Sequence, residues 1–256
     1  MSQYQRSAPG ATSGAASARV VVTGAAGEIG LAIAQRFAGQ GARLVLTDLD
    51  LDGLEAAARR LPTGAVAAMV PHDVSRMAAG EHVAEISREA LGEVDALICC
   101  AGLYEDIPLD GVGVPEWRRS LTVNLDGVFY TIQALRPLLA EGSAIVNMAS
   151  LAGHRGSLDH TPYATAKGGV LALTRSLAQE LAPRTRVNAV SPGLIDTAMM
   201  QALGRERRET MIAATPLRRL GAADEVAAAT VFLAGPDAGF ITGETLQING
   251  GLYLHS

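Results

Sequence analysis

Short runs of apolar, often β-branched residues alternate along the chain with longer segments of helical period. The runs have the length and composition of buried strands and lie at Arg19–Thr23, Ala42–Thr47, Val66–Val70, Ala96–Cys100, Ser143–Met148, Arg186–Val190 and Leu246–Ile248. The segments between them predict helices over Ile29–Gln40, Leu51–Arg60, Met77–Leu91, Pro115–Leu139, Pro162–Ala182 and Asp224–Ala234. Apolar strands separated by helices are typical of a parallel sheet that is covered on both faces. The pattern predicts an α/β domain, a doubly wound Rossmann fold with a seven-stranded parallel sheet.

Two segments fall outside this alternation. Residues 1–18 are rich in Ser, Ala and Gly and are expected to form a disordered tail. The stretch from about 194 to 221 places methionines and arginines among poor strand formers. It predicts either a surface helical insertion or a lid over a substrate, because ligands of doubly wound sheets lie beyond the carboxyl ends of the strands. We predict a single domain over residues 19–256 that includes this lid.

Composition and charge narrow the classes of partner. The 256 residues carry a formal charge of −5 and no basic run, which argues against a nucleic-acid surface. No apolar stretch reaches the roughly 18 residues that a membrane span needs, and the first residues lack an apolar signal core, so a cytoplasmic protein is expected. The adjacent Cys99 and Cys100 cannot form an ordinary disulfide and are interpreted as core residues, and no metal site is expected. Small molecules are the expected partners.

A glycine-rich turn follows the first predicted strand. It reads Thr23-Gly-Ala-Ala-Gly-Glu-Ile-Gly30 and leads into a helix, so backbone amides at the helix N-terminus can face a pyrophosphate. Such turns also occur in proteins that bind nothing. The second strand ends at Asp48, about where a dinucleotide fold holds the adenosine ribose, although Asp48 alone is equally consistent with a helix cap. Asp73 follows the third strand and is placed to border an adenine. Together these features predict a dinucleotide site.

The candidate catalytic residues are polar side chains in a helix, after a strand and in an apolar segment. Tyr163 and Lys167 are spaced one helical turn apart, and a nearby ammonium lowers the pKa of a phenol from about 10. Ser150 follows a strand, where its hydroxyl can hydrogen-bond a substrate oxygen on which charge develops. Asn124 lies in an apolar helical segment and by itself would be a satisfied buried amide. Each signal is weak alone, and their combination predicts a proton-transfer site.

The chain resembles the short-chain dehydrogenase/reductase family from about residue 19 to residue 253. The resemblance lies in an ordered series of motifs, Thr23-Gly24 with Gly30, Cys99-Cys-Ala-Gly102, Asn124, Ser150, Tyr163-x-x-x-Lys167 and Ser191-Pro-Gly193. It implies an oxidoreductase that transfers a hydride between NAD(H) and a secondary alcohol or its ketone. Tyr163 would then be the general acid/base, and Ser150 would orient the substrate oxygen. Lys167 would hold the nicotinamide ribose and lower the pKa of Tyr163, and Asn124 would anchor a water that relays the proton.

The resemblance also implies which residues hold the cofactor. They lie in the turns after the predicted strands and on the helix of Tyr163. The full set is Gly24, Gly27, Glu28, Ile29, Gly30, Asp48, Asp73, Val74, Ala101, Gly102, Tyr163, Lys167, Pro192, Gly193, Ile195 and Thr197. The family usually has glycine where this chain has Glu28, and a carboxylate beside the pyrophosphate is unfavourable unless it turns to solvent or the loop shifts. Cofactor affinity is therefore expected to be modest.

Within the family the scaffold is most similar to the 3-oxoacyl-(acyl-carrier-protein) reductases, through residues 216–221 and 241–253. Those enzymes resemble one another in using NADPH and a basic residue before the fifth strand. This chain has Asp48 and Glu141 in the corresponding places, so Asp48 predicts NAD(H) rather than NADP(H).

Three functional hypotheses follow. The leading one is an NAD(H)-dependent dehydrogenase of a free secondary alcohol. The alternatives are a reductase of carrier-bound 3-oxoacyl chains and a catalytically silent NAD-binding sensor or scaffold. The apolar segment 240–254 and the resemblance to tetrameric relatives predict a homotetramer. His154, Arg155 and His160 lie between Ser150 and Tyr163, where they are either pocket-lining residues or exposed loop residues.

Overall fold

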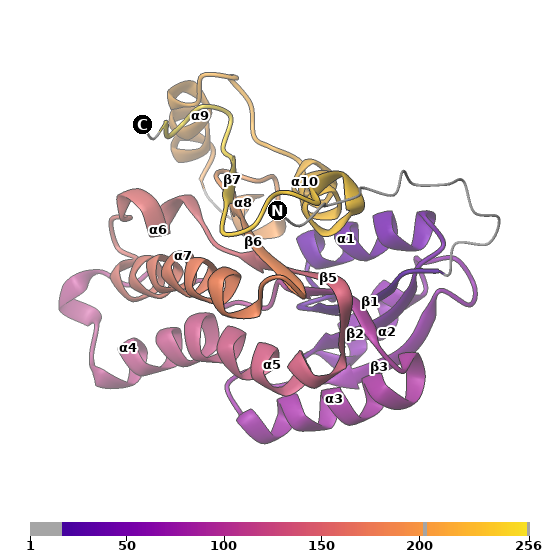
Figure 1. Cartoon of the computed structure of the whole chain (residues 1–256). Helices are drawn as coiled ribbons and strands as arrows, with labels where there is room; N and C mark the ends of the chain where they lie inside the picture. Colours follow the sequence, from indigo (N-terminus) through magenta and orange to yellow (C-terminus); the bar gives the residue numbers. More distant parts are fainter. Residues whose placement is uncertain (1–16, 202–203, 255–256) are drawn as a thin grey trace, which may run out of the picture.

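A parallel β-sheet runs through the molecule, with helices on both of its faces (Figure 1). The computed structural model describes residues 17–201 and 204–254, so the first sixteen residues of the predicted tail lie outside the described residues. The strands are β1 (Arg19–Thr23), β2 (Arg43–Asp48), β3 (Val66–Pro71), β4 (Val94–Cys99), β5 (Leu139–Met148), β6 (Thr185–Pro192) and β7 (Thr245–Ile248). Their order is β3-β2-β1-β4-β5-β6-β7, and every neighbouring pair is parallel. The predicted seven-stranded Rossmann fold is confirmed.

Helices from distant parts of the chain cover each face. One face carries α1 (Glu28–Gly39), α2 (Leu51–Ala58) and α10 (Ala223–Ala234), and α1 lies beside α10. The other face carries α3 (Met77–Leu91), α4 (Val114–Leu121), α5 (Gly127–Leu135) and α7 (Thr161–Leu181). The short helices α6 (Leu151–Arg155), α8 (Ala198–Gln201) and α9 (Arg205–Ala214) follow the carboxyl ends of β5 and β6. None of the helices in the described ranges has an apolar stretch that could cross a bilayer.

The strands place alternate side chains in two hydrophobic cores. In β1, Val20 and Val22 contact the layer of α1 and α10, whereas Val21 contacts the layer of α3, α5 and α7, and all three are fully buried. Cys99 belongs to the second core, and Cys100 packs against the first. Because both faces of the sheet are covered, the strands appear in the sequence as continuous apolar runs. The two cores fix the carboxyl ends of the strands, where the turns of the candidate site begin.

The segment predicted as one helix over Pro115–Leu139 is interrupted. After α4, a π-helical turn covers Thr122–Asp126, and a 3₁₀ turn over Arg136–Leu138 follows α5. Pro137 in the 3₁₀ turn has no amide to continue the hydrogen bonding of α5. β5 then begins at Leu139, earlier than predicted, because Leu139 pairs with Val94 before the register shifts. The prediction of a single helix was therefore wrong, and the π-helical turn contains Asn124.

Candidate active site

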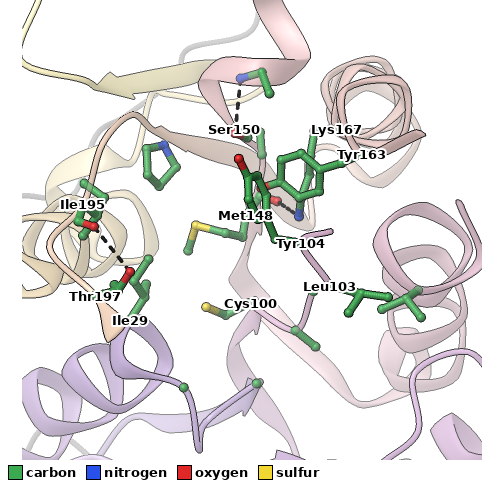
Figure 2. A pocket seen from close by; sticks show the side chains of 18 of the residues that line it. Ile29, Cys100, Leu103, Tyr104, Met148, Ser150, Tyr163, Lys167, Ile195 and Thr197 are labelled. Atoms are coloured by element: carbon green, nitrogen blue, oxygen red, sulfur yellow. Dashed lines mark hydrogen bonds between the residues drawn. The ribbon is translucent and has the colours of Figure 1, made fainter. Parts of the chain in front are cut away.

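A cavity of about 1280 Å³ opens at the carboxyl ends of the strands, where the order of the sheet reverses between β1 and β4. Doubly wound sheets bind ligands at this place. Every residue predicted to hold the cofactor lines the cavity, as do Ser150, Tyr163 and Lys167. Asn124 is fully buried and does not line it. Figure 2 shows Ser150, Tyr163 and Lys167 on one side of the cavity and Ile195 across from them.

The turn after β1 has a shape that requires glycine. Gly24 has a φ of 68°, and a Cβ there would lie 2.7 Å from the Ala101 nitrogen. A Cβ on Gly30 would lie 2.1 Å from the carbonyl oxygen of Gly24, so α1 could not approach the turn. Gly27 precedes α1 and has no side chain to cap the first helical amides. Uncapped amides at a helix N-terminus favour an anion, so this turn fits a phosphate group.

The acidic end of the cavity lies after β2. Asp48 is half-buried, and its carboxylate accepts hydrogen bonds from the amides of Ala26 (2.9 Å) and Asp50 (3.1 Å). Leu49 and Asp50 line the same end and add no positive charge. Burial lowers the pKa of the neighbouring His72 to about 4, so its imidazole is neutral at neutral pH. A ligand at this end therefore meets a fixed carboxylate and no cation from these neighbours.

Glu28 lies in the first turn of α1 and lines the cavity. Its Oε2 accepts a hydrogen bond of 2.8 Å from the amide of Ala198, the first residue of α8. The sequence left two orientations open, beside the pyrophosphate or turned to solvent. The structure shows a third orientation, because the carboxylate is held by a backbone amide of the stretch predicted as a lid.

Tyr163 and Lys167 lie one turn apart near the start of α7 (Figure 2). Lys167 is only 2% exposed, and its Nζ donates a hydrogen bond of 2.8 Å to the carbonyl of Met148. The same Nζ lies 5.7 Å from the centroid of the Tyr163 ring. Burial lowers the pKa of Lys167 to about 8. Burial also raises the pKa of Tyr163, and a hydrogen bond with Ser150 acts in the opposite direction.

The raised pKa of Tyr163 differs from the expectation that Lys167 lowers it. Desolvation disfavours both the phenolate and the ammonium, and this effect is the largest for each side chain. The ammonium is hydrogen-bonded to Met148 rather than to the phenol oxygen. Tyr163 is therefore a protonated phenol at neutral pH, which is the form that can donate a proton to a substrate oxygen.

Asn124 anchors the loop that follows β4. Its Oδ1 accepts a hydrogen bond from the amide of Leu103 (2.9 Å), and its Nδ2 donates to the carbonyl of the same residue (2.8 Å). A Cβ on Gly102 would lie 2.9 Å from Asn124 Oδ1 and 3.5 Å from Lys167 Nζ, so this loop approaches both side chains closely. The structure therefore brings Asn124 close to the site. Its role as a water anchor stays a prediction.

The part of the cavity around Tyr163 contains residues that sequence reasoning missed. Tyr104 and Asp106 come from the loop after β4, and their only sequence signal is their place beyond the carboxyl end of a strand. His160, left open by the sequence, is buried and lines the cavity. Arg155 lines it from an exposed position. His154 does not line this cavity, and its Nε2 lies 2.9 Å from Nε2 of Gln247.

Comparisons with known proteins show that the chain is similar to reductases and dehydrogenases. Residues 24–253 match the family model described as enoyl-(acyl carrier protein) reductase. The 3-oxoacyl-(acyl-carrier-protein) reductase of Escherichia coli strain K12 is 38% identical over 237 residues, which cover 91% of this chain and 96% of the reductase. An acetoacetyl-CoA reductase of Allochromatium vinosum is 36% identical over 244 residues, which cover 92% of this chain and 98% of that protein.

A solved structure is similar over nearly the whole fold. It is a crystal structure from Brucella melitensis, described as a short-chain dehydrogenase/reductase and as a glucose/ribitol dehydrogenase. It is 43% identical with a TM-score of 0.90, and the match covers 93% of this chain and 98% of that chain. The predicted resemblance of the scaffold to the 3-oxoacyl reductases is confirmed by the similarity to the Escherichia coli protein.

Proposed function

Because the chain belongs to the short-chain dehydrogenase/reductase family, a family of oxidoreductases, we propose that it interconverts a secondary alcohol and its ketone with NAD(H). The observation that carries the proposal is a single cavity with Asp48 at one end and Ser150, Tyr163 and Lys167 at the other. The glycine turn after β1 lies along the same cavity. The acidic end supports the choice of cofactor, and the hydroxyl groups of Ser150 and Tyr163 support the reaction.

The residues along the cavity fit NAD(H) from end to end. Asp48 would hold the adenosine ribose, and the turn at Gly24 with the first amides of α1 would hold the pyrophosphate. Ile195 and Thr197 would contact the nicotinamide carboxamide. When bound, the nicotinamide supplies or accepts the hydride, and the protein contributes position and electrostatics.

Asp48 supports NAD(H) over NADP(H). A phosphate of charge about −2 held about 5 Å from a carboxylate is repelled by about 1.7 kcal/mol in bulk water, and by more where the dielectric constant is lower. Even this lower figure corresponds to more than a tenfold difference in affinity, since about 1.4 kcal/mol is tenfold. Leu49, Asp50 and the neutral His72 provide no compensating cation. The carboxylate is also held in place by two backbone amides, so it cannot turn away without losing them.

Tyr163 moves the proton in this proposal. In ketone reduction its phenol gives the proton to the carbonyl oxygen as negative charge develops there and is left as the phenolate. In alcohol oxidation the phenolate form of Tyr163 accepts the proton of the alcohol. Ser150 donates a hydrogen bond to the same substrate oxygen. Lys167 uses one of its three N–H groups on Met148, which leaves others for a ribose hydroxyl. Its deep burial keeps these donors in a fixed position.

The stretch 194–221 is proposed as a lid over the substrate. Its two ends are joined by an isolated parallel bridge between Ile195 and Gly221. Between these ends, Met200 and Met211 line the cavity from α8 and α9. The hydrogen bond from the Ala198 amide to Glu28 connects the lid to α1. A lid built in this way excludes water from the site and stays attached to the cofactor-binding turn.

Reduction of a 3-oxoacyl thioester is the second candidate function. The similarity to the reductases of Escherichia coli and Allochromatium vinosum supports it more directly than it supports a free alcohol. Charge argues against docking of an acidic carrier protein. Glu141 is exposed where the resemblance to carrier reductases implies a basic residue, and the guanidinium of Arg184 donates hydrogen bonds to the carbonyl of Leu139.

A comparison of substrates tests this proposal. Purified protein is assayed with NADH and NADPH on a free ketone, on the same 3-oxoacyl group carried by a small thioester, and on that group linked to the carrier protein. We expect turnover of the free ketone with NADH, and a kcat/KM for the carrier-linked substrate within about threefold of the small thioester. Glu141→Lys should raise kcat/KM for the carrier-linked substrate and leave kcat/KM for the small thioester unchanged. If kcat/KM of the wild type for the carrier-linked substrate is about a hundredfold above that for the small thioester, the second candidate function is established.

A further inference from the structure

Asp106 and His160 face each other across a gap on the substrate side of the cavity. His160 Nε2 lies 3.8 Å from Asp106 Oδ1, and both residues line the cavity. The imidazole is 4% exposed. Its Nδ1 lies 3.0 Å from Ser157 Oγ, but its Nε2 has no hydrogen-bond partner within the described residues. A buried polar atom without a partner is rare in a folded protein, so this nitrogen can take a hydrogen-bond partner from the cavity.

Neighbouring contacts hold the gap in a fixed geometry. Tyr104 stacks on His160 with ring centroids 4.5 Å apart. The Tyr104 ring also meets the Tyr163 ring edge-on, with centroids 5.0 Å apart, and Figure 2 shows these two side chains together. Asp159 has a φ of 63°, and its carbonyl accepts a hydrogen bond of 2.8 Å from the amide of Ile107. Non-glycine residues rarely adopt this conformation, and such strain concentrates at functional sites. The loops before α7 and after β4 are thereby joined beside the proposed proton donor.

The gap fits a hydroxyl group better than other oxygen groups. A separation of 3.8 Å is longer than a direct hydrogen bond, yet an oxygen atom can lie about 2.8 Å from both atoms at once. The facing carboxylate favours the tautomer of His160 with its proton on Nε2, while Ser157 donates to Nδ1. The gap then has a donor on one side and an acceptor on the other. A hydroxyl satisfies both, whereas a ketone, ether or thioester oxygen only accepts.

We propose that Asp106 and His160 bind a second hydroxyl group of the substrate, so that diols and polyols are the preferred alcohols of this protein. The proposal rests on the proposed function, because Tyr163 must act on the first hydroxyl. Hydrogen bonds that include a charged partner are the stronger ones, and the second hydroxyl is worth at least about tenfold in kcat/KM. A 3-oxoacyl group has no hydroxyl for this gap.

The test compares cyclohexanol with the cyclohexanediols whose second hydroxyl lies on the neighbouring or the next carbon, with NAD as oxidant. In the wild type the better diol should exceed cyclohexanol by at least about tenfold in kcat/KM. His160→Phe keeps a ring against Tyr104 but removes both nitrogens, and Asp106→Ala removes the acceptor. Each should bring kcat/KM for the diol within about twofold of that for cyclohexanol, so the ratio of the two values is the quantity that reports the loss of the hydroxyl site. Leu158→Ala, on the same loop and also lining the cavity, is the control and should leave the ratio unchanged.

The outcomes separate this site from the proposed function. The rate with cyclohexanol reports the function, and the ratio of diol to cyclohexanol reports the hydroxyl site. A ratio near one in the wild type, or a diol preference that persists in both variants, overturns the hydroxyl site and leaves the function standing. Absence of turnover with every alcohol, in a protein that still binds NADH, contradicts the function and the hydroxyl site together. If His160→Phe does not fold, Asp106→Ala decides the result alone.

Discussion

The two halves of the cavity are built in different ways. The cofactor half consists of a glycine turn, helical amides and one carboxylate, and most of it follows directly after β1 and β2. The substrate half consists of side chains from separate loops, which are Tyr104, Asp106, His160, Met200 and Met211. Backbone groups present the same donors whatever the side chains are, whereas side chains differ in size, charge and hydrogen bonding. The first half therefore fits one kind of ligand, and in the proposed function the second half would decide which alcohol is accepted.

Tyr163 and Lys167 lie where the two halves meet. If the halves are independent, a substitution in one half changes the KM for the ligand of that half and leaves the KM for the other ligand unchanged. A change at the junction should instead affect turnover with every substrate. The substitutions described next test whether the two halves of the cavity are independent.

The largest effect is expected for Tyr163→Phe. Removing the phenol oxygen removes the proton donor, and general acid/base groups contribute roughly 10²- to 10⁴-fold to turnover. The Phe side chain keeps the ring that contacts Tyr104, so the fold and both halves should persist. Titration of NADH by fluorescence should give a dissociation constant within about twofold of the wild type. A kcat near that of the wild type would remove Tyr163 from the mechanism.

Lys167→Met tests how strongly the Lys167 ammonium is desolvated where the two halves of the cavity meet. Burial lowers the pKa of Lys167 from 10.5 to about 8, so between these values the unfolded chain binds more protons than the folded chain. The free energy of unfolding of the wild type should therefore increase as the pH rises through this interval. Because one pKa unit corresponds to about 1.4 kcal/mol, the increase that Lys167 contributes is about 3 kcal/mol in total. Below about pH 8 the contribution does not vary with pH.

The measurement is the difference in the free energy of unfolding between the wild type and Lys167→Met, obtained from urea unfolding at several pH values. Burial raises the pKa of Cys99 and of Cys100 to about 12, so each thiol contributes stability that is lost as the pH rises above about 9. Both proteins contain these thiols, and their effect largely cancels in the difference. Curves for the wild type and Lys167→Met that stay parallel from pH 8 to 10.5 would contradict the buried, desolvated Lys167.

The smallest effect is expected for Glu28→Gln, which concerns the cofactor half alone. The amide oxygen can still accept the hydrogen bond from Ala198, but the negative charge near the glycine turn after β1 is lost. An exposed charge contributes roughly 0.5–1 kcal/mol, so the KM for NAD should fall about two- to fivefold at low salt. The KM for the alcohol should not change. Glu81→Gln on the exposed side of α3 is the control, and equal KM values for NAD in both variants would argue against the effect.

The sequence locates the glycine turn and Asp48 at the carboxyl ends of the first two strands because these features are local. Gly24 and Gly30 lie within one turn, and Asp48 ends a strand that the apolar pattern locates. The position of the Glu28 side chain was not predictable, because its partner Ala198 lies 170 residues later. The gap between Asp106 and His160 likewise depends on two loops that come together only in the folded chain.

The sheet was also easier to predict than the helices. Its strands are buried on both faces, so their apolar runs stand out. The helix expected over Pro115–Leu139 is interrupted at Asn124, and hydrophobic periodicity alone does not reveal a π-helical turn. The upward shift in the pKa of Tyr163 was missed for a similar reason, since residue spacing places Lys167 near it but does not report how deeply both are buried.

The most direct test of the central claim is the ratio of kcat/KM for NAD to that for NADP, measured on one alcohol with the wild type, Asp48→Ala and Asp52→Asn. The account predicts at least about a tenfold preference for NAD in the wild type. Asp48→Ala should narrow this preference by raising the KM for NAD. Asp52 is an exposed carboxylate in α2, and Asp52→Asn should leave the preference for NAD unchanged. Equal efficiency with NADP in the wild type would contradict the account, because the carboxylate of Asp48 would then not decide the cofactor.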